Sequence, residues 1–234
     1  MRFAPLALTM LLGATTPAMS QVHVNIRIDI PMYPSLQRVP GYPVYYAPGI
    51  NSNYFFYDGL YWVYEGDNWY ESTWYNGPWA IVDPFAVPLY LLRVPVRYYR
   101  HPPAYFRGWR GDAAPRWGDH WGRSWEEKRS GWNQWNRSSA PAPAPRPTYQ
   151  RQYSGSSYPQ AQQQAVIQAQ RYSYQPHDSV AQQHFQQQRA LAPAAREERV
   201  ERPQPQAQER SQGRGNERGQ GRDRERDNER GRDR

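Results

Sequence analysis

The chain has 234 residues, a formal net charge of +8, a mean hydropathy of −1.03 and no cysteine. The lack of cysteine excludes disulfide bonds, thiolate metal sites and a lipid anchor on a mature N-terminal cysteine. The folded part must therefore be held together by packing alone.

The first twenty residues have the pattern of a cleavable secretory signal peptide. Arg2 supplies a positive charge, residues 3–13 form a short apolar run, and residues 18–20 (Ala-Met-Ser) are suitable for a signal peptidase. We expect cleavage after Ser20, with a cut after Ala18 as the alternative. No later stretch approaches the roughly 18 apolar residues that a membrane helix needs, so we predict no transmembrane segment. The mature chain is expected to be periplasmic or secreted.

The next region predicts a small, aromatic-rich antiparallel β-meander. Residues 22–30 alternate apolar and polar side chains, as a half-buried strand does. Asp58-Gly59 is a two-residue hairpin signal of type I′, and further turn signals lie at residues 65–68 and 75–78. The strands expected from this pattern are residues 22–30, 54–57, 60–64, 69–74 and 79–82.

Residues 84–103 are apolar but contain five prolines. Proline has no N–H to donate to a sheet, so a central strand is not expected there. We predict an extended wrap along the surface, which would complete a meander domain of residues 21–103.

All ten tryptophans lie between residues 62 and 135, and the last five fit one helical stripe. At about 100° per residue they share one face of a helix over residues 115–136. Three glycines in this helix each cost about 1 kcal/mol relative to alanine, so the helix needs a surface to dock on. We call residues 104–137 the arm. Its stripe, which is either structural or partner-facing, comprises Trp117, Trp121, Trp125, Trp132 and Trp135.

Charge is divided between the meander and the arm. Residues 39–92 contain five acidic residues and no Lys or Arg, whereas residues 93–137 contain ten basic and four acidic residues, a net charge of +6. This division predicts that the arm docks on the meander. The alternative is an arm that contacts anionic envelope polymers or lipid headgroups.

Low-complexity sequence follows the arm. Residues 138–193 are rich in Pro and Gln and predict a linker with two candidate short helices, over 160–172 and 178–191, the second capped by Asp178. Residues 194–234 carry twelve Arg and ten acidic residues. We predict a disordered tail that acts as a tether or spacer. Its interleaved acids cancel the field that nucleic-acid binding requires, so no nucleic-acid partner is expected.

No catalytic or metal-binding motif is present in the sequence. The five histidines have neither H-x-H nor H-E-x-x-H spacing. Glu65, Asp67 and Glu71 lie within seven residues, and paired carboxylates can serve as acid and base in catalysis. The presence of Asp67 is also explained by its place in a turn, where acidic side chains hydrogen-bond to the backbone. We therefore predict no enzyme, no metal site and no cofactor.

The aromatic residues of the meander are the candidate binding residues. Strand alternation gives both faces of the sheet aromatic side chains, and exposed indole or phenol rings suit stacking on sugars. Alternatively, the wrap and the arm cover the second face. The candidates are Trp69, Tyr70, Trp74, Tyr75 and Trp79.

Five segments of the chain resemble a group of exported Gram-negative bacterial proteins. The segments are Tyr57-Asp58-Gly59, Asn68-Trp69-Tyr70-Glu71, Tyr75-Asn76-Gly77-Pro78-Trp79, Arg93-Val94-Pro95 and Tyr98-Tyr99-Arg100. Members of the group combine a signal peptide, a WY…YNGPW meander, a Pro-rich segment and a charged low-complexity tail. The resemblance covers residues 54–135. It implies an envelope location and a non-catalytic character, and it implies no ligand.

Together these patterns predict a non-enzymatic structural or interaction protein of the periplasm or envelope. One alternative is a glycan- or peptidoglycan-binding module that uses exposed Trp and Tyr. Another is a peripheral binder of anionic lipid through the arm. The expected partner is a cell-wall polymer or another envelope protein, and the sequence indicates no oligomeric state.

Overall fold

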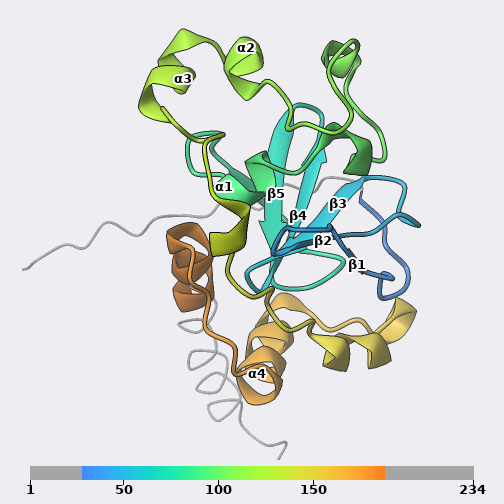
Figure 1. The fold of residues 1–234 in the computed structure, drawn as a ribbon. Coiled ribbons are helices and arrows are strands. Elements are labelled where there is room, and N and C mark those ends of the chain that lie inside the picture. Colours follow the sequence, from blue (N-terminus) through green and yellow to red (C-terminus); the bar gives the residue numbers. More distant parts are fainter. Residues whose placement is uncertain (1–27, 188–234) are drawn as a thin grey trace, which may run out of the picture.

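The computed structural model describes residues 28–187, and its centre is a six-stranded antiparallel sheet (Figure 1). Each strand pairs with the next one along the chain, which confirms the predicted meander and the mainly β class. The strands are β1 (Gln37–Arg38), β2 (Val44–Tyr46), β3 (Asn53–Tyr57), β4 (Leu60–Glu65), β5 (Asn68–Ser72) and β6 (Ala80–Val82).

Two tight turns set the register of the three longest strands. Tyr57 pairs with Leu60 across the β3–β4 turn, and both turn residues, Asp58 (φ 51°) and Gly59 (φ 87°), have positive φ. This is the predicted type I′ hairpin. The β4–β5 turn has the same two-residue form, with positive φ at Gly66 and Asp67.

The sheet is buried on both faces. Phe55, Trp62 and Trp69 lie on the first face, and Tyr54 and Tyr61 lie on the second. Aromatic side chains fill both layers because alternate residues of each strand point in opposite directions. The first face is covered by α1, the arm and a helix over residues 179–187, and the second by residues 28–36 and 144–158.

The strand predicted over residues 22–30 lies mostly outside the described residues. The described part, residues 28–30, is not a strand. Its alternation still governs burial, because Ile28 and Ile30 are buried on the second face while Asp29 is exposed. The Ile30 N–H donates to the side chain of Asn76 at 2.8 Å.

The Pro-rich segment is only partly the extended wrap we predicted. No strand forms between residues 84 and 103, but short helical turns do. Leu91, Leu92 and Val94 are fully buried against the first face. The segment is therefore a core element of the fold. Its turns are α1 (Leu89–Leu92) and η1 (Val96–Tyr98), and η2 (Ala104–Phe106) follows at the start of the arm.

The single Trp helix predicted for the arm is wrong in its continuity. It is divided into α2 (Trp117–Trp121) and α3 (Arg123–Lys128) by Gly122, whose φ of 85° no α-helix accommodates. The residues that follow α3 form turns. The stripe nevertheless points inward: three of its members are buried and two are half-buried. The buried members are Trp117, Trp125 and Trp132, and the half-buried ones are Trp121 and Trp135.

The arm docks on the meander, as the charge division predicted, but packing dominates the contact. The indole of Trp117 donates to the carbonyl oxygen of Leu92 at 2.9 Å and packs against Tyr64. Within residues 28–187, one ion pair joins the arm to the meander, from His120 to Asp67 at 2.6 Å. Arginines of the arm instead donate to backbone carbonyls, as Arg129 does to Val87.

The linker predicted after the arm is wrong for residues 138–187, because this stretch is packed into the fold. Gln150 is completely buried, accepts from the N–H of Tyr75 and donates to the carbonyl of Thr73. Both candidate helices are present, the second beginning after Asp178. The elements are η3 (Arg137–Ser139), η4 (Thr148–Gln152), η5 (Gly155–Ser157), α4 (Ala161–Arg171) and the helix over 179–187.

The predicted signal peptide and the predicted tail over residues 194–234 lie outside the described residues. None of the helices between residues 28 and 187 combines the length and apolar character needed to cross a membrane.

Candidate functional site

The aromatic residues predicted to form an exposed binding platform are buried. Their relative exposures lie between 0% and 6%, so they offer no ring to a ligand. The second face is covered by residues 28–36 and 144–158, and the first by α1 and the arm. The sequence did not predict that residues 144–158 cover the second face, because their composition indicated a linker. The residues concerned are Trp69, Tyr70, Trp74, Tyr75 and Trp79.

The three carboxylates that we considered as an acid–base group are engaged separately. Glu65 is exposed at the end of β4. Asp67 binds the arm through His120. Glu71 is buried on β5 beside His184. No three His, Asp or Glu side chains within residues 28–187 gather closely enough to hold a metal ion.

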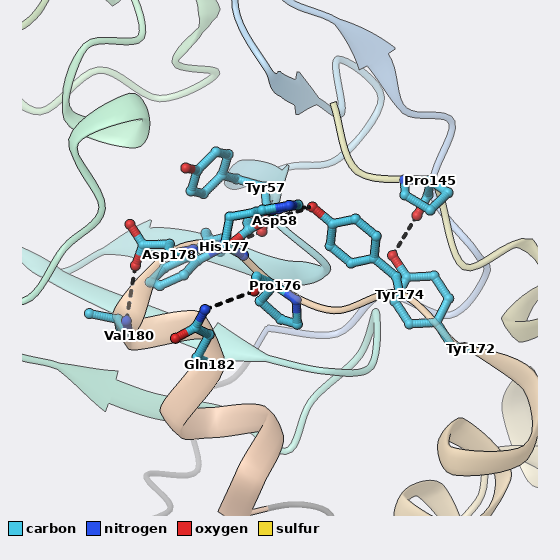
Figure 2. Close-up of polar contacts among 11 residues, drawn as sticks. Tyr57, Asp58, Pro145, Tyr172, Tyr174, Pro176, His177, Asp178, Val180 and Gln182 are labelled. Atoms are coloured by element: carbon cyan, nitrogen blue, oxygen red, sulfur yellow. Dashed lines mark hydrogen bonds and ion pairs between the residues drawn. The ribbon is translucent and has the colours of Figure 1, made fainter. Parts of the chain in front are cut away.

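A set of polar contacts between distant parts of the chain surrounds Asp58 in the β3–β4 turn (Figure 2). Its carboxylate accepts from the Tyr174 hydroxyl at 2.7 Å and from the backbone N–H groups of His177 and Asp178 at 2.8 and 2.6 Å. The side chain is buried. Three donors therefore replace the water that the carboxylate loses, which makes each of these bonds strong. We call Asp58 with residues 172–187 the latch.

Asp178 continues the latch into the final helix. Its own carboxylate accepts from the N–H of Val180 at 3.0 Å, which is the predicted N-cap interaction. The side chain of Gln182 donates back to the carbonyl of Pro176, as Figure 2 shows. Asp58 and Asp178 thus accept from N–H groups before and within the first turn of the helix, which have no acceptor inside the helix itself.

Close packing over Gly59 completes the latch. A Cβ atom on Gly59 would lie 3.0 Å from the ring of Phe185 and 3.2 Å from that of Tyr174. Glycine is therefore required at this position for two reasons. Its φ of 87° is unfavourable for other residues, and the rings that lie over it leave no room for a side chain. Tyr172 anchors the beginning of the segment by donating to the carbonyl of Pro145.

A buried contact between a histidine and a glutamate holds the same helix to the sheet. Nδ1 of His184 lies 2.8 Å from Oε1 of Glu71, and both side chains are more than 90% buried. Oε2 of Glu71 and both ring nitrogens of His184 have no partner with hydrogen-bond geometry among the described residues. Removing either side chain would leave a buried charge or dipole without compensation.

Electrostatics in the latch centre on Asp178. Burial raises the pKa of its carboxyl group, and the neighbouring charge of Asp58 raises it further. Because the pKa of this carboxyl group is higher in the folded protein than in the unfolded chain, the folded protein holds the proton up to a higher pH. The contribution to stability is greatest below the ordinary pKa of 3.8 and falls as the pH rises through the folded-state pKa.

Asp178→Asn should therefore stabilise the protein at pH 7. Asparagine keeps the N-cap acceptor and removes a half-buried charge beside Asp58. We expect a gain of a few tenths to about 1 kcal/mol in urea unfolding, shrinking toward zero near pH 4. Asp178→Ala, which removes the cap, should cost about 1 kcal/mol. Lower stability of the Asn variant than of wild type at pH 7 would contradict this assignment.

A second polar cluster joins the β4–β5 turn to the arm. Asp67 accepts from the hydroxyls of Tyr64 and Tyr105 and contacts Nε2 of His120, whose ring stacks on Tyr105 at 3.8 Å. Burial by itself would raise the pKa of Asp67, but hydrogen bonds from Tyr64 and His120 outweigh it and hold the pKa below its usual value. The cluster fixes the arm to the turn.

Comparison with protein-family models, with curated proteins and with solved structures found no match. The function must therefore be inferred from the geometry of the chain itself.

Proposed function

We propose that this protein is a non-enzymatic, exported structural or interaction protein of the bacterial envelope, whose folded part anchors a charged tether. The observation that carries the proposal is the latch. It fixes residues 172–187 to the central hairpin, and residues 188–193 connect it to the segment 194–234 with its twelve Arg and ten acidic residues. A tether of this kind needs a firm attachment at its base.

The contacts of the acidic side chains in the sheet turns and strands support a structural role. Asp58, Asp67 and Glu71 each bind a segment more than 50 residues further along the chain. Each contact stabilises a junction between segments. The predicted signal peptide gives the envelope as the compartment.

The two alternatives from the sequence receive less support. A glycan platform on the meander aromatics is not proposed, because those rings are buried. Insertion of the arm into lipid would need outward-facing indoles, whereas Trp117, Trp125 and Trp132 face the core.

Site-specific photo-crosslinking tests the proposal in a Gram-negative host that exports the full chain. A photoreactive amino acid is placed at Gln220 in the tail or, as a control, at Met32, which is 71% exposed on the folded part. We expect crosslinks to an envelope polymer or envelope protein from position 220 and none from position 32.

Two results would overturn the proposal. One is crosslinking from position 32 with none from position 220. The other is turnover in an unbiased hydrolase screen that Glu71→Gln abolishes while the circular dichroism spectrum is unchanged.

A further inference from the structure

A large open groove lies on the arm, on a part of the molecule that the latch does not use. Its volume is about 1010 Å³, and it is lined by the arm from residue 110 to residue 137 together with Tyr42 and Arg93. The arm residues that line it include Trp132 and Trp135. The groove therefore combines aromatic rings with many charged groups.

Arg93 is the unusual member of this lining. It is more than nine-tenths buried, yet no carboxylate within residues 28–187 lies at ion-pair distance from it. Its guanidinium donates to the backbone carbonyls of Trp132 and Gln134 and lies 5.3 Å from the ring of Trp135. A buried cation without a counter-ion is costly, and burial accordingly lowers the pKa of Arg93. An incoming anion would relieve that cost.

A second guanidinium lies at the same end of the groove. Arg137 is exposed and lies 5.7 Å from the ring of Tyr42. That ring is 5.0 Å from the ring of Trp135, and the guanidinium of Arg93 lies 5.3 Å from the Trp135 ring. Two arginines and an aromatic pair thus line the same groove, and this combination suits an anionic group attached to a ring.

The rest of the lining limits which anion would fit. Arg110 is paired with Asp112 and Arg116 with Asp119, and the lining further includes Arg123 and the acidic side chains of Glu126 and Glu127. A densely charged phosphate polymer would meet repulsion from these carboxylates. A chain with one acidic group among many hydroxyls would instead find acceptors for those hydroxyls.

We propose that this groove binds an acidic saccharide, with its carboxylate between Arg93 and Arg137 and a sugar ring against Trp135. This proposal is independent of the tether described above, because it concerns the arm and not the tail. The ligand is a glycan with isolated carboxylates.

Calorimetric titration of the full chain tests the proposal with a matched pair of ligands. N-acetylglucosaminyl-N-acetylmuramic acid carries one carboxylate, and N,N′-diacetylchitobiose is a neutral counterpart. We expect the acidic disaccharide to bind at least about tenfold more tightly. Arg137→Gln should remove about fivefold of this preference, and because Arg137 is exposed the variant should fold normally.

Arg107→Gln is the matched control, since Arg107 is an exposed arginine of the arm outside the groove. It should leave both affinities within about twofold. Equal affinity for the two disaccharides, or an unchanged preference in Arg137→Gln, would overturn the proposal. Tighter binding of inorganic polyphosphate than of the acidic disaccharide would overturn it in favour of a phosphate polymer.

Discussion

Asp58→Asn is expected to lower the free energy of unfolding by about 2–3 kcal/mol at pH 7. The buried carboxylate accepts from the hydroxyl of Tyr174 and from two backbone N–H groups. The side-chain amide of asparagine carries no charge, and its NH₂ group is a donor that cannot accept a hydrogen bond from these N–H and O–H groups. The turn itself should survive, because Asn-Gly is the preferred type I′ sequence. Urea unfolding followed by circular dichroism measures the loss.

Asp83→Asn provides the matched control for this experiment. Asp83 is an exposed turn residue whose carboxylate accepts from the N–H of Phe85 at 2.8 Å. Asparagine can make the same bond, so the change should stay within about 0.5 kcal/mol. Equal effects of the two substitutions would show that Asp58 does not hold the latch.

Trp117→Ala is expected to cost about 3–5 kcal/mol and to release the arm from the sheet. The indole is completely buried, donates to the carbonyl of Leu92 and lies 4.4 Å from the stacked ring of Trp121. Its removal leaves a cavity between the arm and Tyr64 and an unsatisfied carbonyl oxygen. Unfolding monitored by far-ultraviolet circular dichroism measures the cost.

Trp109→Ala is the comparison, because Trp109 is a half-buried tryptophan of the same arm that stacks on Phe106. Less of its surface leaves water on folding, so we expect less than half the cost of Trp117→Ala. If the two variants were equally stable, the docking of the arm through Trp117 would be refuted.

Local signals in the sequence predicted the local parts of this fold. Asp58-Gly59 specifies its hairpin through backbone preference alone, and Asp178 specifies a helix start in the same way. The Trp stripe predicted an inward-facing arm. It missed the break at Gly122, because the periodicity of side chains does not report the φ angle of one glycine.

Long-range contacts explain what the sequence did not reveal. Asp58 and Asp178 are 120 residues apart, and no local sequence pattern at either residue predicts their contact. Gln150 lies in a stretch that composition marks as solvated, yet its amide is buried because it meets Thr73 and Tyr75. Polar composition indicated exposure, whereas satisfied hydrogen bonds allowed burial.

These contacts change how the C-terminal half of the described chain is understood. Within this half, residues 144–158 cover the second face, residues 174–178 bind the central hairpin, and His184 contacts the buried Glu71 from the first face. The groove with Arg93 lies on the arm instead. The proposed attachment for the tail and the proposed ligand site therefore occupy separate parts of the molecule.

Hydrogen–deuterium exchange of the full chain at pH 7 tests the latch most directly. Its N–H groups at His177 and Asp178 donate to Asp58, and the helix over 179–187 packs on the first face. We predict that peptides covering residues 172–187 exchange at least about a hundredfold more slowly than unstructured peptide. Exchange of these peptides at the unprotected rate, with β4 still protected, would contradict the latch and the tether built on it.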